Sequence, residues 1–308
     1  MPCARAWTWA CSSGWWTVGA RARVRLPGTC GELVQGTLAG TPFLVSCPID
    51  LYATVEVTLG DGPGPLVAPR RTPKARAALE AALAYWGEEG RAARLRVESG
   101  LARGKGLGSS TADVGGAIYA AALALGRDLS PQEVGRLAVN TEPSDSTLFP
   151  GLALFDHRNA SLYEPLGPAP HLDILVLDGG GRVDTVRYNQ RDHRALLQKL
   201  EPEHREALAL LRAGLQENDS TLIGRAATLS ARTHQALLFK PALDHALALG
   251  SEVGAVGVCV GHSGTVIGLL LDPAHTNATR AAEYIQPRLR GLQLLAVTRL
   301  VGGGIRNA

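Results

Sequence analysis

A glycine-rich stretch between Leu101 and Tyr119 contains the residues best suited to chemistry in this chain of 308 residues; it reads LARGKGLGSSTADVGGAIY. Glycines let backbone N–H groups approach a ligand closely, and hydroxyl side chains at 109–111 can cap a helix whose positive dipole end faces the same point. A loop of this kind leading into a helix forms an anion site suited to phosphate. The sequence therefore predicts a phosphate-binding loop followed by a helix of small residues that begins near Ser109.

The spacing within this loop excludes two common phosphate-binding motifs. Lys105 precedes the first serine by four residues, so the loop is not the Walker pattern GxxxxGK[ST], in which the lysine directly precedes the hydroxyl residue. The loop is also not a Rossmann fingerprint, because the acidic residue expected about 20 positions further on, after a second strand, is missing. A different class of phosphate-binding protein is indicated.

A second group of candidate residues lies in the segment TEPSDS, residues 141–146. Phosphoryl transfer needs a cradle for the polyphosphate, a ligand for Mg²⁺ and a group that positions or deprotonates the alcohol. Glu142 and Asp145 are three residues apart in a turn interrupted by Pro143, so both carboxylates can point into one cleft. The alternative interpretation is a plain turn stabilised by the Asp145 side chain.

Three segments of the chain resemble the motifs of the GHMP kinases, a family that includes galactokinase, homoserine kinase and mevalonate kinase. GLGSSTA at 106–112 resembles their second motif, which wraps the ATP phosphates, and PGTCGELVQG at 27–36 resembles the first. GAVGVCVGHSGTVIG at 254–268 resembles the third, although it has fewer glycines than the family pattern. The three segments occur in the order found in the family.

The resemblance covers residues 21–308 and implies the fold of that family. This fold is α+β with two domains: an ATP-binding domain at residues 21–165 and a C-terminal α+β domain at residues 166–308. The active site is then expected in the cleft between the domains. Residues 1–20 hold four of the five tryptophans and fall outside the resemblance, so we expect a disordered or non-native start, with a partner-docking tail as the alternative.

The resemblance also implies ATP and Mg²⁺ as cofactors and gives roles to individual residues. Ser110 and Glu142 match the family's Mg²⁺ ligands, and Asp145 matches the catalytic aspartate, which accepts the proton of the alcohol or only orients it. Glu133 fits the family spacing better than Glu142, but a capping box with Ser130 explains it without a metal. Asp113 is a second-choice metal ligand, explained equally by the helix dipole. The residues expected to bind ATP are Lys105, Gly106, Leu107, Gly108, Ser109, Ser110 and Thr111, with a solvated side chain as the alternative for Lys105.

The first motif is expected to line the pocket of the phosphate acceptor through Thr29, Cys30 and Glu32. A zwitterionic amino acid needs an anion for its ammonium group, which Glu32 can supply, and donors for its carboxylate. His262 can contact that carboxylate or a phosphate, or merely a backbone carbonyl. Cys30 is better explained as a small buried filler than as a nucleophile. The pair at 156–157 is interpreted as surface or supporting polar residues.

Several strings are most similar to one branch of the family, which phosphorylates the side-chain hydroxyl of L-threonine for cobalamin biosynthesis. They are PGTCGELVQG, KGLGSSTAD, EPSDSTLF, LFDH and GHSGTVIG. The resemblance therefore implies a small-molecule kinase whose product is O-phospho-L-threonine. A kinase for another small alcohol, such as homoserine or a mevalonate-type acid, and a non-catalytic ligand-binding protein of the same fold are the alternatives.

Composition fits a soluble globular protein. Hydrophobic residues make up 45% and charged residues 19% of the chain, and the net charge of +3 is too small to indicate a nucleic-acid or membrane partner. No apolar run reaches the ~18 residues that a membrane span requires. The five cysteines are scattered without CxxC spacing, which favours a reducing cytoplasm, and the oligomeric state is left open.

Hydrophobic periodicity and turn residues predict the elements that must position these groups. We expect strands at 21–26, 32–35, 43–47, 51–59, 93–98, 152–155, 172–177, 255–260, 265–271 and 292–300. We expect helices at 73–86, 109–125, from Ser130 onward, 191–213, 217–236, 241–249 and 274–287.

Overall fold

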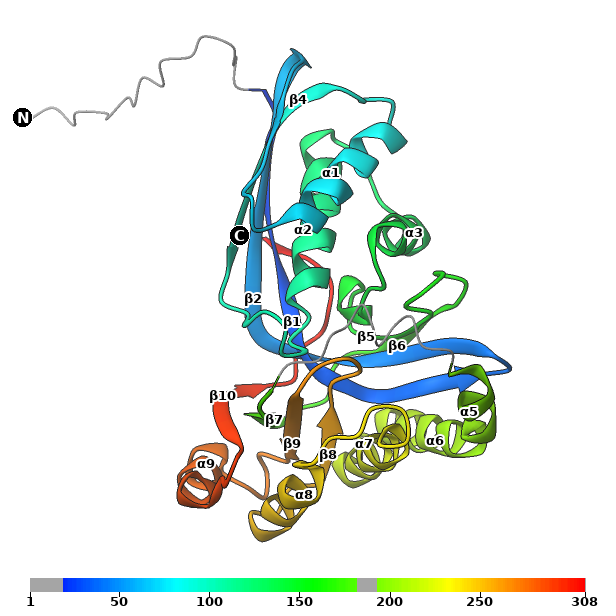
Figure 1. Cartoon of the computed structure of the whole chain (residues 1–308), viewed down its shortest axis with the longest axis vertical. Helices are drawn as coiled ribbons and strands as arrows, with labels where there is room; N and C mark the ends of the chain where they lie inside the picture. The colour runs from blue at the N-terminus through cyan, green and yellow to red at the C-terminus, as the bar shows by residue number, and fades with distance from the viewer. Residues whose placement is uncertain (1–18, 182–192, 308) are drawn as a thin grey trace, which may run out of the picture.

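A single curled sheet runs through the part of the chain described by the computed structural model, residues 19–181 and 193–307 (Figure 1). Its main path has the order β10-β7-β9-β8-β1-β2-β4-β3. The expected N-terminal tail lies outside the described residues up to residue 18. The strands are β1 (Arg21–Leu38), β2 (Thr41–Pro63), β3 (Leu66–Val67), β4 (Arg91–Ser99), β5 (Leu152–Phe155), β6 (Tyr163–Gly167), β7 (Asp173–Asp178), β8 (Gly257–Val260), β9 (Val266–Leu271), β10 (Gln293–Arg299) and β11 (Arg306–Asn307).

The hairpin of β1 and β2 is longer than the sequence predicted. We expected Pro27–Gly28 to end one strand and a gap to divide β2, but both strands are continuous. The pairing register shifts between Pro27 and Gly28 and again on each side of Glu32. Such bulges let a strand bend without ending, because the extra residue is absorbed in the ladder. Figure 1 shows the result: the hairpin turns from the upper part of the sheet into the lower part and links the two halves.

Three helices cover one face of the upper part of the sheet: α1 (Pro73–Tyr85), α2 (Ser109–Ala124) and α3 (Pro131–Thr141) (Figure 1). The small residues of α2 let it lie directly on the sheet, since a Cβ on Gly116 would come within 2.4 Å of the Val55 side chain. The predicted capping box of α3 is confirmed, with Glu133 Oε2 accepting from Ser130 N at 2.8 Å. The carboxylate of Glu133 is therefore engaged in this capping interaction at the surface.

The helices of the second half pack beneath the lower part of the sheet (Figure 1). They are α5 (Arg194–Lys199), α6 (Glu201–Glu217), α7 (Ser220–His234), α8 (Leu243–Glu252) and α9 (Ala278–Ile285), and short 3₁₀ turns lie at η1 (Ser146–Leu148) and η2 (Gln286–Arg288). The prediction of a single helix at 191–213 is wrong. In the described residues this segment divides at Leu200 into α5 and α6. Pro202 in the first turn of α6 lacks a backbone N–H, which favours a new helix start there.

Buried apolar residues form three clusters that do not divide at residue 165. One cluster lies between α1, α2 and the upper sheet, and another lies between the sheet and α8 and α9. The third joins Val34, Val45 and Leu154 to Leu211 and Ile223 of the C-terminal helices. The chain end also returns to the first half, where β11 pairs with β1. The boundary at 165/166 remains a prediction, and the two halves share a continuous interior.

Candidate active site

The three motifs singled out in the sequence meet at the glycine-rich loop. The carbonyl of Lys105 accepts hydrogen bonds from the backbone N–H groups of Thr265 at 2.9 Å and Val266 at 3.0 Å. The carbonyl of Leu107 accepts from the N–H of Thr29 at 3.0 Å. Backbone bonds of this kind fix the path of the loop independently of its own side chains. Segments from the beginning, the middle and the end of the chain therefore build one site.

Contact between the loop and the turn after β8 depends on a residue without a side chain. A Cβ on Gly264 would lie 2.3 Å from the Cα of Gly106 and 2.4 Å from the carbonyl oxygen of Lys105. The carbonyl of Gly264 accepts from the buried ammonium group of Lys240, whose pKa burial lowers to about 8. The turn therefore packs backbone to backbone against the glycine-rich loop. It is also bound by the side chain of Lys240, which lies in the segment before α8.

The start of α2 differs from the predicted capping arrangement. Gly108 is the N-cap residue, in a left-handed conformation with φ of 66°, and no side chain caps the helix. The prediction that Ser109 or Ser110 caps it is wrong, because both already belong to the first turn. Their hydroxyls can face the cavity, and the first N–H groups of a helix have no partner within it. The loop and the helix start together have the geometry of an anion site, and phosphate binding there remains a prediction.

A cavity of about 700 Å³ opens at this helix start and contains most of the predicted site residues. Those that line it are Glu32, Gly106, Leu107, Gly108, Ser109, Ser110, Thr111, Glu142, Asp145 and His262. Thr29, Cys30 and Lys105 do not belong to the lining. The structure therefore brings the phosphate loop, the acidic segment and parts of the first and third motifs to a single cavity.

Ser110 and Glu142 come together as expected for a magnesium site. The hydroxyl of Ser110 donates to one carboxylate oxygen of Glu142, and the ammonium group of Lys74 contacts the other. Hydroxyl and carboxylate oxygens are the donors that Mg²⁺ prefers, and it commonly takes only one or two protein ligands beside substrate phosphates. The donor set fits this ion, and in the described residues no three His, Cys, Asp or Glu side chains form a metal-binding group.

Asp145 lies beside the phosphate loop. A Cβ on Gly108 would come within 3.0 Å of its Oδ2, and its backbone N–H donates to Thr111 Oγ1 at 3.0 Å. The side chain makes no capping hydrogen bond to the following 3₁₀ turn, so the interpretation as a plain turn residue finds no support. Burial raises the pKa of Asp145 to about 6, hydrogen bonding from Thr111 opposes this, and the charge of Glu142 adds to it.

Glu32 stands where the two halves of the sheet join. It forms the register pair of β1 with β8, opposite Val260, and the pair of β1 with β2, opposite Ser46. Its side chain is 2% exposed, and Oε2 has no hydrogen-bond partner among the described residues. Burial and the neighbouring carboxylate of Asp145 hold the pKa of Glu32 well above its usual value. A cationic ligand group between these two carboxylates would be stabilised by both.

The other three predicted residues have structural surroundings of their own. Thr29 is buried, and its hydroxyl accepts from the N–H of Cys47 at 3.0 Å. Cys30 is buried next to the free thiols of Cys47 and Cys259, as expected for a filler. Lys105 forms an ion pair with Asp178 at 2.6 Å. Neither of the two interpretations of Lys105, as a phosphate ligand or as a solvated side chain, included this pair. Their contacts to ligands remain predictions.

Asp113 proves to be an ion-pair partner and not a residue of the first helical turn. It is the fifth residue of α2, so the dipole explanation is wrong, and its Oδ2 lies 2.7 Å from a guanidinium nitrogen of Arg103. Burial raises the pKa of Asp113, and Arg103 opposes this. The pair ties the helix to the residue just before the glycine-rich loop.

Four residues that were not predicted for the site also line the cavity: Arg71, Lys74, Arg103 and His157. Lys74 sits in the first turn of α1, where a cation is disfavoured by the helix dipole, and that mismatch could have identified it. His157 and Asp156 were interpreted as surface or supporting residues, yet they are 4% and 0% exposed. The surface alternative is wrong for both, because the turn after β5 folds inward against the acidic segment.

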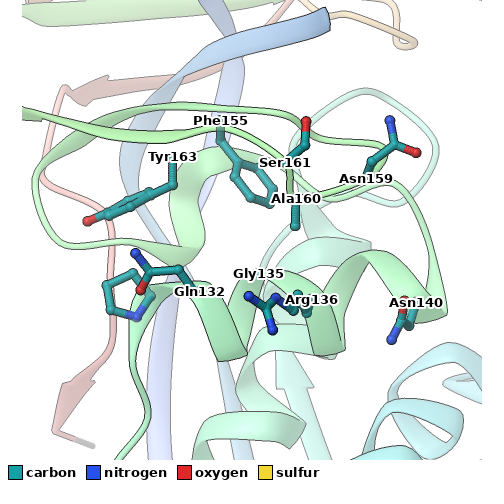
Figure 2. Close-up of a pocket in the computed structure, with 10 residues that line it drawn as sticks. Gln132, Gly135, Arg136, Asn140, Phe155, Asn159, Ala160, Ser161 and Tyr163 are labelled. Atoms are coloured by element: carbon teal, nitrogen blue, oxygen red, sulfur yellow. The ribbon is translucent and has the colours of Figure 1, made fainter.

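A second cavity, of about 630 Å³, lies between α3 and the β5–β6 hairpin (Figure 2). Figure 2 shows Gln132 and Arg136 of α3 facing Phe155, Ser161 and Tyr163 across it. Its described lining includes no buried side-chain atom that lacks a hydrogen-bond partner. It shares no lining residue with the cavity at α2 and contains none of the predicted site residues.

Comparison with known proteins finds two matching family models and two similar kinases. The family model described as "GHMP kinases N terminal domain" matches residues 73–149, and the model "GHMP kinases C terminal" matches residues 211–286. The L-threonine kinase of Citrobacter freundii is 39% identical over 82% of this chain and 86% of its own length. The L-threonine kinase of Salmonella typhimurium is 36% identical over 92% and 95%, respectively.

Solved structures share the fold. The homoserine kinase of Cytophaga hutchinsonii has a TM-score of 0.69 with 19% identity, over 96% of this chain and 100% of that one. At this identity the likeness concerns the fold alone. In the described residues, no helix is long and apolar enough to cross a membrane.

Proposed function

Because the chain belongs to the GHMP kinase family, we propose that it transfers the γ-phosphoryl group of ATP to the side-chain hydroxyl of L-threonine, giving O-phospho-L-threonine. Two relatives named L-threonine kinase, at 36–39% identity over most of the chain, support the choice of acceptor. The observation that carries the proposal is the placement of Asp145 and Glu32 in the cavity that the phosphate loop opens.

The phosphates of ATP bind at the start of α2. Backbone N–H groups of 106–110 and the positive end of the helix dipole attract them, and the side chains of Lys74 and Arg103 add positive charge nearby. Ser110 and Glu142 are the residues that hold Mg²⁺, which when bound neutralises charge on the transferring phosphoryl group. Lys74 orients the Glu142 carboxylate from its other side.

The acceptor binds on the side of the cavity that carries the buried carboxylate of Glu32 and the half-buried carboxylate of Asp145. Asp145 lies close to the loop and orients the threonine hydroxyl toward the phosphoryl group, or accepts its proton. Glu32 lies deeper, and its unpartnered oxygen meets the ammonium group of the amino acid. An ammonium group there favours the ionised form of both carboxylates, so that binding of the acceptor prepares Asp145 to act.

The same proposal places this reaction in the cytoplasm and in the synthesis of the cobalamin linker. Resemblance of the motifs to the threonine-specific branch supports the second point. Free, buried thiols at Cys30, Cys47 and Cys259 suit a reducing compartment and support the first.

Ser110→Ala is expected to reduce turnover by more than about tenfold, because a ligand of Mg²⁺ is lost while the loop keeps its path. Ser109→Ala is the matched control. Both serines line the cavity, but of the two it is the Ser110 hydroxyl that donates to Glu142. Initial rates should be measured over a titration of Mg²⁺ at saturating ATP. Unchanged kinetics of Ser110→Ala would remove this hydroxyl from the mechanism.

An ADP-release assay with four acceptors tests the proposed function directly. L-threonine and L-serine carry the hydroxyl on the carbon next to the one that bears the ammonium group and differ by a methyl group. L-homoserine carries the hydroxyl one carbon further away, and mevalonate has no ammonium group. We expect L-threonine to give the highest kcat/KM and mevalonate the lowest, since mevalonate has no cation for Glu32. A preference for homoserine or mevalonate would assign the chain to another acceptor, and no release with any of the four would favour a binding protein.

A further inference from the structure

His157 carries a buried imidazole that the reaction described above leaves unused. The side chain is 4% exposed, it lines the cavity together with Glu32 and Asp145, and neither ring nitrogen has a hydrogen-bond partner among the described residues. Buried polar groups in folded proteins are nearly always hydrogen-bonded. An unpartnered ring at the wall of a ligand cavity therefore indicates that the ligand supplies the partner.

The turn that carries His157 is held rigidly. The carboxylate of Asp156 accepts from the N–H of Asn159 at 3.1 Å and from the hydroxyl of Ser161 at 2.6 Å. The carbonyl of His157 accepts from the N–H of Ser144 at 3.0 Å, which joins the turn to the acidic segment. Asn159 and Ser161 belong to the lining of the second cavity, whereas His157 lines the first. Asp156 is thus a positioning residue for the imidazole.

The ring of His157 belongs to a group of histidines whose rings contact one another. His157 and His262 meet edge to face with ring centres 4.9 Å apart, and Nδ1 of His262 lies 2.6 Å from Oε1 of Gln35. Burial and the nearby charge of Arg158 lower the pKa of His157 to about 3. The free protein therefore holds a neutral imidazole, which has one N–H to donate and no charge to be neutralised.

We propose that His157 binds the α-carboxylate of the acceptor by donating a ring N–H to it, and so selects an amino acid over a simple amino alcohol. This inference rests on the proposed function. The acceptor side of the cavity is otherwise acidic, with Glu32 and Asp145, and would repel a carboxylate. Two of the cations that line the cavity are already paired beside the phosphate loop, Lys74 with Glu142 and Arg103 with Asp113. A donor at His157 offsets that repulsion.

Two acceptors separate this role from general effects. L-threonine carries ammonium, hydroxyl and carboxylate, whereas (R)-1-amino-2-propanol has the same ammonium and hydroxyl without the carboxylate. His157→Leu removes both ring nitrogens, and His157→Gln keeps an N–H donor. His275→Ala is the control, since His275 is an exposed histidine on the loop before α9. Steady-state kinetics of all four proteins should be measured with both acceptors, together with thermal melting to verify folding.

We expect His157→Leu to raise KM for L-threonine about tenfold to a hundredfold, the usual cost of a hydrogen bond to a charged group. Its kcat/KM for aminopropanol and its KM for ATP should not change, and His157→Gln should lie between Leu and wild type. An equal loss with both acceptors, or a rise in KM for ATP alone, would overturn the proposal. Wild-type KM for L-threonine in a folded Leu variant would do the same while leaving the proposed function intact. Absence of threonine phosphorylation by the wild type would instead refute the function itself.

Discussion

Asp145→Asn is expected to lose most of kcat, about 10²–10⁴-fold, with little change in KM for ATP. The substitution keeps the shape of the side chain and removes the charge beside Gly108 of the proposed phosphate loop. If Asp145 only orients the hydroxyl, the loss should be smaller and KM for L-threonine should rise. Asp128→Asn, at an exposed aspartate just after α2, is the control and should behave as wild type.

The pKa of Asp145 gives this prediction a second readout. Because burial raises that pKa from 3.8 to about 6, the folded protein binds a proton more tightly than the unfolded chain between these two values. Stability is therefore lost as pH rises through about 6, and Asn, which has no charge to bury, escapes this loss. At pH 7 the variant should melt no lower than wild type, with its advantage shrinking toward pH 4. In the wild type without acceptor bound, the ionised form declines below about pH 6.

If Asp145→Asn keeps the wild-type kcat and the wild-type KM values for ATP and L-threonine, Asp145 neither accepts the proton of the hydroxyl nor orients it. Lost activity accompanied by a lower melting temperature at pH 7 would point to a structural cause. The combination expected here, lower kcat with undiminished stability, arises only if the charge serves catalysis at the expense of the fold.

Gly264→Ala is expected to damage the site severely. The new Cβ would lie 2.3 Å from the Cα of Gly106 and 2.4 Å from the carbonyl of Lys105, and backbone atoms cannot move aside as a flexible side chain can. The turn and the phosphate loop must separate, which weakens the bonds from Thr265 and Val266 to Lys105. A displacement of ~1 Å at a reacting centre can cost ~10²-fold in rate, and we expect kcat/KM for ATP to fall by about that factor.

Gly261→Ala provides a matched control three residues earlier in the same turn. Its Cβ would meet the Val266 side chain at 3.2 Å and no backbone atom more closely, so a small rotation relieves the contact. ATP kinetics and melting temperature should be measured for both variants, with Gly264→Ala losing ~1–3 kcal/mol of stability from overpacking. If Gly264→Ala keeps wild-type KM for ATP, the third motif does not hold the loop.

Local features of the fold were predictable from the sequence because neighbouring residues determine them. The α3 capping box needs only Ser130 and Glu133, three positions apart, and the helix of small residues after the glycine-rich loop follows from its composition. Pairing of Ser110 with Glu142 and the approach of Asp145 to the loop were predicted through family resemblance and not from spacing. The prediction was wrong at the expected breaks in β1 and β2. There the two strands stay paired, and bulges in their register take the place of the expected turns.

The sequence predicted a glycine-rich loop suited to phosphate and an acidic turn, and resemblance to the family added two flanking motifs. Tertiary structure alone decided how the charges are arranged. Lys105 pairs with Asp178, and Asp113 pairs with Arg103. Burial and the neighbouring Asp145 raise the pKa of Glu32, while desolvation and the charge of Glu142 raise the pKa of Asp145. The physical reason is that burial and electrostatic interactions depend on distance in space, and these partners come from segments far apart along the chain.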